Sequence, residues 1–168
     1  HAVLEFGVGA GWNLRGLQCQ RRVGIDVECF LAPGWESLGI EFRHGIQDVA
    51  ERSFDIVLCH HALEHVDNPA EILVGLRRIA RPDGRLLLAV PYEFERRYRV
   101  FDPAEPNHHL FSWNVQTLGN LLTVSGWRVE SIGINRYGYD RFAANLAHRT
   151  HLGERGFLFV RNLLQILK

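Results

Sequence analysis

The chain has 168 residues, of which 46% are hydrophobic, and it carries 19 basic and 19 acidic side chains. This length and apolar content predict one compact domain with its own hydrophobic core. Because the charges balance, no net positive field attracts a nucleic-acid backbone or an anionic membrane, so we expect no nucleic-acid partner and favour a small-molecule substrate.

The first predicted strand, Ala2–Phe6, runs directly into glycines on alternate positions, Gly7, Gly9 and Gly11. Glycine has no Cβ, so it permits positive φ angles and lets the backbone approach a ligand closely. The pattern therefore predicts a nucleotide-cofactor loop between this strand and a helix over Trp12–Cys19.

The residue after the third glycine separates two classes of cofactor. In the dinucleotide fingerprint G-x-G-x-x-G, the last glycine lets the helix pack closely on the strand. Trp12 stands at that position, and an indole ring cannot replace a packing glycine. This residue argues against an NAD-dependent oxidoreductase, which is the main rival among enzymes.

The middle of the chain alternates predicted strands and helices. Apolar runs predict strands over Arg22–Asp26, Ile40–Arg43, Phe54–His60 and Arg85–Val90. Asn68 followed by Pro69 predicts the start of a helix, which the Pro82–Gly84 turn ends. The alternation predicts an α/β fold, a Rossmann-like three-layer sandwich with a mostly parallel sheet.

The predicted last third begins with an irregular stretch. We expect residues 92–113 to form an insertion on the substrate side of a single domain that spans 1–168. Within it, Arg96, Arg97 and Arg99 either clamp an anionic acceptor or form a solvated face.

Three elements are predicted after this insertion. Asn114 caps a helix that Gly126 ends, and a sixth strand follows over Trp127–Asn135. Apolar residues at helical spacing predict a final helix over Phe157–Leu167.

Several motifs recur together along the chain. They are the glycine loop, Asp26 ending strand 2, Ser53–Val57, Leu63–Val66, Arg81–Leu88 and Ser125–Val129. Together they resemble the class I S-adenosylmethionine-dependent methyltransferases, in particular the type 11/12 group that includes the quinone-pathway enzymes. The resemblance implies the class I fold, S-adenosylmethionine as cofactor, and methyl transfer to an oxygen, nitrogen or carbon of a small-molecule acceptor. The family's sheet normally ends with an antiparallel seventh strand, and we find no candidate for that strand.

The resemblance also implies which residues contact the cofactor. They are Glu5, Gly7, Val8, Gly9, Gly11, Asp26, Val27, Asp48 and His60. Asp26 is placed to accept both ribose hydroxyls, and Val27 offers an apolar surface to adenine. Asp48 contacts the adenine amine or belongs to a solvated loop. Glu5 organises the glycine loop or approaches the methionine end of the cofactor through water, and His60 offers its backbone to the cofactor's amino group.

The candidates for catalysis are His61, His65 and His109. Methyl transfer needs a positioned nucleophile, while a base is optional. His61 or His65 is a general base in one interpretation, and in another Leu63–Val66 is a structural motif with His65 hydrogen-bonded near the cofactor. His109 contacts the acceptor or is an ordinary surface histidine.

A third interpretation concerns a metal ion. Quinone-pathway methyltransferases hold a divalent cation in an E-x-x-E-H pattern, and this chain has His61 at the first glutamate position. Histidine there disfavours magnesium, which prefers oxygen ligands. We therefore assign no metal ligand.

Cysteine usage and hydropathy bear on the location of the protein. The three cysteines, Cys19, Cys29 and Cys59, match neither a disulfide framework nor a metal motif. No apolar run approaches the roughly 20 residues that would span a bilayer. We expect a cytoplasmic protein without a membrane span. The absence of methionine and the start at His1 also predict segments beyond one or both ends.

An alternative outside the enzymes stays open. A chain of this fold can bind the cofactor as an inactive regulatory or partner subunit, because fold does not guarantee chemistry.

Overall fold

The computed structural model describes residues 1–27, 32–93, 100–134, 143, 146–147, 149–150 and 153–166. The chain divides into two compact units, His1–Ile132 and Gly133–Lys168. The single domain over 1–168 stays a prediction. Arg96, Arg97 and Arg99 lie outside the described residues.

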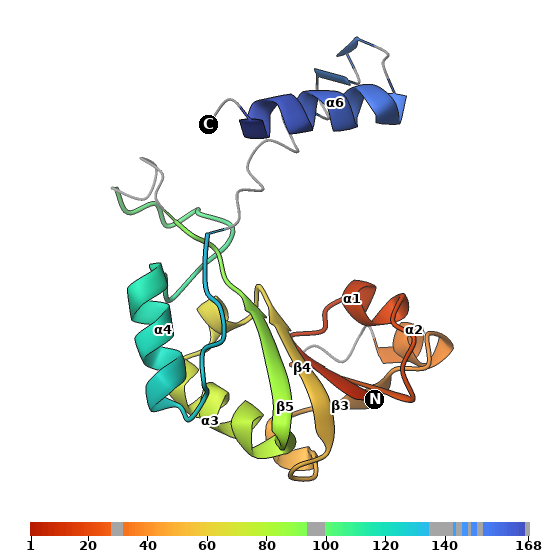
Figure 1. Ribbon diagram of the computed structural model, residues 1–168, viewed down its shortest axis with the longest axis vertical. Helices are drawn as coiled ribbons and strands as arrows, with labels where there is room; N and C mark the ends of the chain where they lie inside the picture. Colours follow the sequence, from red (N-terminus) through yellow and green to blue (C-terminus); the bar gives the residue numbers. More distant parts are fainter. Residues whose placement is uncertain are drawn as a thin grey trace. The chain divides into compact units, whose positions relative to one another are not determined.

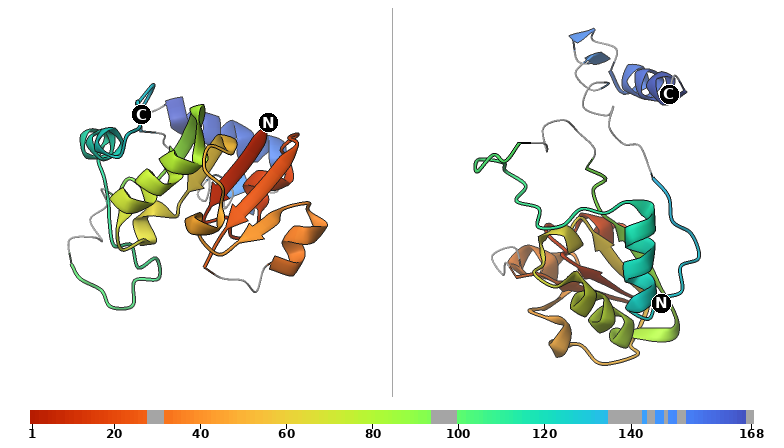
Figure 2. Two further views of the ribbon diagram at one scale, coloured as in Figure 1. Left: turned by 90° about the horizontal axis from the view of Figure 1, so that it is seen from below. Right: turned by 90° about the vertical axis from the view of Figure 1, so that its left-hand side faces the viewer.

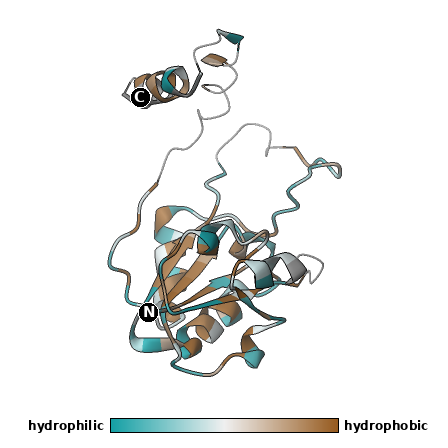
Figure 3. Ribbon diagram, turned by 90° about the vertical axis from the view of Figure 1, so that its right-hand side faces the viewer, coloured by the Kyte–Doolittle hydropathy of each residue, from teal (hydrophilic) through white to brown (hydrophobic). Residues whose placement is uncertain are grey.

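The first unit is built on a five-stranded parallel sheet in the order β3-β2-β1-β4-β5. Its strands are β1 (Ala2–Phe6), β2 (Arg21–Ile25), β3 (Glu41–Arg43), β4 (Phe54–His60) and β5 (Ala80–Ala89). The hydropathy colouring shows that the strands of this sheet are mainly hydrophobic (Figure 3). The α/β, Rossmann-like prediction is confirmed.

Helices cover both faces of this sheet (Figures 1 and 2). The helices of this unit are α1 (Trp12–Arg15), α2 (Ala32–Ser37), α3 (Pro69–Ile79) and α4 (Val115–Val124), with single 3-10 turns η2 (Ile46–Asp48) and η3 (Leu63–His65). α1 and α2 lie on one face, and α3 and α4 on the other. The three layers expected from the sequence are therefore present.

Alternation along β1 creates a separate core on each face. Val3 packs with Val8, Leu14 and Trp35 beneath α1 and α2, whereas Leu4 belongs to the larger core beneath α3 and α4. Successive side chains of a strand point to opposite faces, so one strand supplies both cores.

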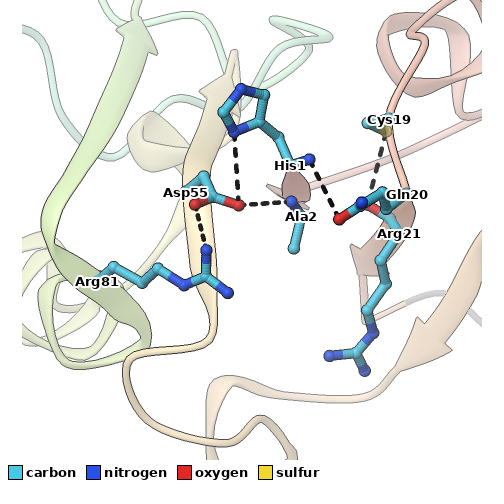
Figure 4. Close-up of polar contacts among 7 residues, drawn as sticks. All are labelled: His1, Ala2, Cys19, Gln20, Arg21, Asp55 and Arg81. Atoms are coloured by element: carbon cyan, nitrogen blue, oxygen red, sulfur yellow. Dashed lines mark hydrogen bonds and ion pairs between the residues drawn. The ribbon is translucent and has the colours of Figure 1, made fainter.

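A polar cluster joins strands at the amino edge of the sheet (Figure 4). The Ala2 amide donates a 2.7 Å hydrogen bond to Asp55, which also accepts from the Arg81 guanidinium. These contacts hold the pKa of the Asp55 carboxyl below its usual range. The hydrogen bond from the Ala2 amide contributes most, and Arg81 adds to it. The cluster lies at the opposite end of the strands from the glycine loop and joins β1 to β4 and β5.

Two predicted helix ends were wrong by several residues. The first helix ends at Arg15 instead of Cys19, because Gly16 forms its C-cap. Leu14 lies within the helix and is buried, whereas Leu17 lies beyond its end and is 37% exposed. The helix that begins at Pro69 ends at Ile79, before the Pro82–Gly84 turn, because the chain pairs with Phe54 from Ala80 onward and bulges before the register continues at Arg85.

The predicted sixth strand was wrong over the residues that the structure describes. Residues 127–134 form no strand, and Asn135 lies outside the described residues. Trp127 instead packs into the core, where its indole Nε1 donates a 3.0 Å hydrogen bond to the Leu73 carbonyl of α3. Trp127, which would begin the predicted strand, is therefore held by α3.

The second unit contains α6 (Gly153–Ile166). This helix confirms the prediction made for Phe157–Leu167, with its start four residues earlier; Leu167 lies outside the described residues. Leu158, Phe159 and Leu163 are exposed on it.

Candidate functional site

The strand order reverses direction between β1 and β4. The chain moves outward from β1 through β2 to β3 on one side, and from β4 to β5 on the other. In open parallel sheets, ligands bind outside the carboxyl ends of the strands at such a switch point. The glycine loop follows β1 and residues 61–65 follow β4, so both predicted parts of the site lie at this point.

The glycine loop adopts the conformation that its sequence predicts. Gly7, Gly9 and Gly11 have φ angles of +73°, +49° and +75°, which side chains with a Cβ disfavour. A Cβ on Gly7 would lie 2.3 Å from the Cβ of Ala62, whereas a Cβ on Gly9 would meet no atom within 4 Å. Gly7 is therefore needed for packing, and Gly9 leaves open space beside the backbone.

Glu5 is buried immediately behind this loop. Its side chain is 1% exposed, and one oxygen accepts a 2.6 Å hydrogen bond from the Asn13 amide of α1. Its other oxygen has no partner among the described residues. Burial raises the pKa of the Glu5 carboxyl above its usual value; the bond from Asn13 opposes this shift, and the Asp26 charge adds to it.

Asp26 and Val27 follow the carboxyl end of β2. The Gly9 amide donates a 2.8 Å hydrogen bond to Asp26 Oδ2, which holds the two segments together. Val27 is 88% exposed. The structure therefore brings Asp26 to the glycine loop, and Val27 follows it in the chain.

Asp48 has a local structural partner. It ends η2, and its carboxylate accepts a 3.1 Å hydrogen bond from the Gly45 amide. Val8 is also part of the fold: it is buried and packs against Gly24 of β2. A Cβ added to Gly24 would lie 2.8 Å from Val8 Cγ1. Contacts of Asp48 and Val8 with a cofactor stay predictions.

The segment after β4 turns sharply at His61. Its φ angle is +51°, an uncommon value for a residue other than glycine, and its amide donates to the Ala89 carbonyl. His61 Nδ1 lies 3.2 Å from Glu64 Oε1, and the Glu64 side chain is fully buried. Partial burial, and then the neighbouring His61, lower the pKa of His60.

His109 comes to this segment from the irregular stretch before α4. The rings of His65 and His109 meet edge to face, with centroids 4.8 Å apart. The Leu110 amide donates a 2.8 Å hydrogen bond to the Glu64 carbonyl, which fixes the stretch against η3. The fold thus gathers the three histidines that we expected in catalysis around Glu64.

The cluster also has the composition of a metal site. Glu64, His65 and His109 each offer a ligand atom, and these atoms lie within 4.8 Å of one another. One carboxylate and two imidazoles suit a transition metal better than magnesium. The metal interpretation therefore stays open beside the general-base one.

One residue of the cluster was missed at the level of sequence. Glu93 follows β5, and its Oε1 lies 2.5 Å from His109 Nδ1. A glutamate just past the carboxyl end of a predicted strand is a usable signal, since such positions face the ligand edge of a parallel sheet. The separation of 16 residues from His109 hid the pair.

Comparison with known proteins decides the family. Residues 1–132 match the methyltransferase domain family. The chain belongs to that family. The resemblance to class I methyltransferases is thus confirmed, and the match covers the whole of the parallel sheet and the glycine loop.

Individual relatives agree with this assignment. The chain is 29% identical over 99 residues to a ubiquinone biosynthesis O-methyltransferase of Hahella chejuensis, which covers 52% of this chain and 42% of that protein. The chain thus spans less than half of the length of this curated relative.

Solved structures show the same fold. A methyltransferase of Mesorhizobium loti, named as dependent on S-adenosylmethionine, has a TM-score of 0.66 at 18% identity and covers 91% of this chain and 84% of its own. A similarly named protein of Aquifex aeolicus has a TM-score of 0.61 at 21% identity, with coverages of 77% and 73%. Across the part of this chain that the structure describes, no helix has the length and apolar character required to cross a bilayer.

Proposed function

We propose that this methyltransferase domain binds S-adenosylmethionine across the switch point between β1 and β4 and transfers its methyl group to a small-molecule acceptor. The glycine loop carries this proposal. Gly9 leaves open space above a backbone whose amide is fixed to Asp26. A ribose and a methionine tail fit such a loop without the third glycine that a pyrophosphate-binding loop uses.

Five of the predicted cofactor residues have a specific role in this proposal. Asp26 accepts hydrogen bonds from the ribose hydroxyls, and Val27 covers one face of adenine. Glu5 and the His60 backbone take the polar methionine end, while Asp48 stays close to the adenine amine. The bound cofactor supplies a methyl carbon already activated by a sulfonium. The residues therefore mainly have to orient the groups and exclude water.

The acceptor lies beside the histidines that follow β4. His61, His65 and His109 surround the buried Glu64 at the carboxyl edge of the sheet. Imidazole titrates near neutral pH, so it suits removal of a hydroxyl or amine proton. Oxygen acceptors come first, since the curated relative is an O-methyltransferase.

Calorimetric titration with S-adenosylhomocysteine and with NAD tests the cofactor. We expect a saturable response to S-adenosylhomocysteine alone. Asp26→Ala removes the carboxylate that accepts from the ribose hydroxyls and should weaken the binding of S-adenosylhomocysteine at least tenfold. Asp83→Ala, in the amino-terminal half of β5 and away from the proposed site, is the control and should leave this binding unchanged. A response to NAD alone would refute the proposal.

The alternative of an inactive subunit needs a separate test. The chain would be screened for methyl transfer from a tritiated donor to phenols, amines and carbon acids. Tight binding of S-adenosylhomocysteine without transfer to any acceptor would favour the inactive subunit.

We also propose a cytoplasmic location. Cys19 and Cys59 are free thiols, as is usual in a reducing compartment. Burial raises the pKa of Cys59 to about 12, so this thiol stays protonated inside the core. Fractionation of cells that express the full-length protein would test the location directly.

A further inference from the structure

The site contains two pairs of imidazole and carboxylate with different surroundings. His61 is 51% exposed and contacts Glu64, which is fully buried. His109 and Glu93 are 14% and 13% exposed, and their contact of 2.5 Å is shorter than the 3.2 Å of the first pair. A short contact between two shielded groups holds an imidazole more firmly than a longer contact whose imidazole is half exposed to water.

The geometry points to Glu93 as a positioning residue that holds His109 as the general base of methyl transfer. This inference rests on the proposed function. His109 Nδ1 lies 2.5 Å from Glu93 Oε1. An ionised carboxylate only accepts, so this contact requires the proton on Nδ1 and leaves the lone pair that can accept a proton on Nε2. The carboxylate thereby fixes both the tautomer and the direction of the ring.

Contacts link this pair to the glycine loop. Ala62 packs closely on Gly7: a Cβ added to Gly7 would lie only 2.3 Å from the Cβ of Ala62. Three residues further along the chain, His65 meets the His109 ring. The Leu110 amide, next to His109, is bound to the Glu64 carbonyl. His109 is therefore held against the segment that borders the proposed cofactor site.

The step can be written with its atoms in balance. A hydroxyl oxygen of the acceptor attacks the methyl carbon, a new oxygen–carbon bond forms, and the carbon–sulfur bond breaks with its electron pair left on sulfur. The hydroxyl proton passes to His109 Nε2. The Glu93 carboxylate stabilises the imidazolium until it gives the proton to water. The acceptor class is a phenol or another weakly acidic hydroxyl, which a neutral imidazole deprotonates as the bond forms.

The first test does not depend on activity. In the ¹⁵N-histidine-labelled chain, the Nδ1–H proton of His109 should resonate far downfield and disappear in His109→Gln. Glu93→Gln should move it upfield, Glu93→Asp should partly retain it, and Glu130→Gln, on an exposed residue, should leave it unchanged. Absence of the downfield signal in the unaltered chain would overturn the inference.

The second test uses a dihydroxybenzoate as the acceptor. Glu93→Gln should lower kcat by roughly tenfold to a hundredfold, with the KM for S-adenosylmethionine unchanged, and Glu93→Asp should recover part of it. Full kcat in Glu93→Gln or in His109→Gln would contradict the assigned roles even if the downfield signal is present.

The two proposals fail in different ways. If no variant and no unaltered chain binds S-adenosylhomocysteine, the proposed function is wrong and with it the role of the pair in methyl transfer. If binding and transfer persist in His109→Gln, the proposed function stands and this inference alone is wrong.

Discussion

At the scale of single residues, the buried carboxylate of Glu5 destabilises the fold. One carboxylate oxygen is bonded to Asn13, and the other is buried without a partner among the described residues. Leaving a buried polar atom unsatisfied costs about 1–3 kcal/mol. A residue that destabilises the unliganded chain and lies behind the glycine loop is consistent with a role in binding the cofactor's polar end.

This cost predicts how stability varies with pH. Because the folded pKa of Glu5 is raised above 4.5, the folded chain favours the neutral carboxyl. The stability that the neutral Glu5 carboxyl contributes to the fold is fully present below pH 4.5, the ordinary pKa of the group. This contribution is lost as the pH rises through the raised pKa of the folded chain. Glu5→Gln should therefore raise the free energy of unfolding at pH 7–8 by about 1–2 kcal/mol, and the gain should shrink toward pH 4.

Urea unfolding between pH 4 and pH 8 measures this difference. Glu36→Gln, which changes an exposed carboxyl, is the matched control. A gain in Glu5→Gln that is the same at every pH would contradict the explanation by ionisation.

At the scale of elements, two glycines of the loop between β1 and α1 have different roles: Gly7 is needed for packing, and Gly9 for cofactor binding. Gly7 and Gly9 both have positive φ, so alanine at either position costs about 1–2 kcal/mol in backbone strain. Gly7→Ala adds a clash with Ala62, for about 1–3 kcal/mol more. Gly9→Ala should keep the fold but lose most of its affinity for S-adenosylhomocysteine, because its methyl group enters the open space. Thermal melting and calorimetry of the pair measure both effects.

Equal stability of the two variants would show that the contact between Gly7 and Ala62 is easily relieved. Unchanged affinity in Gly9→Ala would move the cofactor away from the loop.

The segment after α4 shows why an element can be predicted wrongly. Alternating apolar residues in 127–135 resemble a strand, but Trp127 is held by α3 through its bond to the Leu73 carbonyl. The guanidinium of Arg77 also lies 5.3 Å from the indole ring. These partners come from a helix some fifty residues earlier, so no local pattern could reveal them. Tertiary contacts therefore overrode the strand propensity.

This anchor predicts a measurable loss. Trp127→Phe keeps most of the apolar volume but removes the buried hydrogen bond, so the free energy of unfolding should fall by about 1–2 kcal/mol. The control is Trp12→Phe, since Trp12 is 72% exposed and should change stability by less than about 0.5 kcal/mol. Urea unfolding compares the two variants, and similar effects would contradict an anchoring role for Trp127.

At the scale of the whole molecule, sequence patterns predicted the layers because each strand carries its own apolar signal. β4 is a near-continuous apolar run, as expected for an interior strand that pairs with β1 and β5. The same reasoning identified the glycine loop, His61 and His65 as candidate parts of the site. It could not find Glu93 opposite His109, because their contact depends on the path of an irregular segment that carries no periodicity.

Cofactor binding should stabilise the sheet as a unit, since its proposed contacts come from three strands. A ligand at 100 times its Kd adds about 2.7 kcal/mol to the free energy of unfolding when it binds only the folded chain. For a chain of this size, that corresponds to a rise in Tm of roughly 5–10 °C. S-adenosylhomocysteine should produce this rise in a thermal melt, and NAD at the same concentration should not. The Gly9→Ala variant, which folds but blocks the loop, should show no rise with either ligand. A full rise in that variant would mean that the cofactor stabilises the domain from a site other than the switch point between β1 and β4.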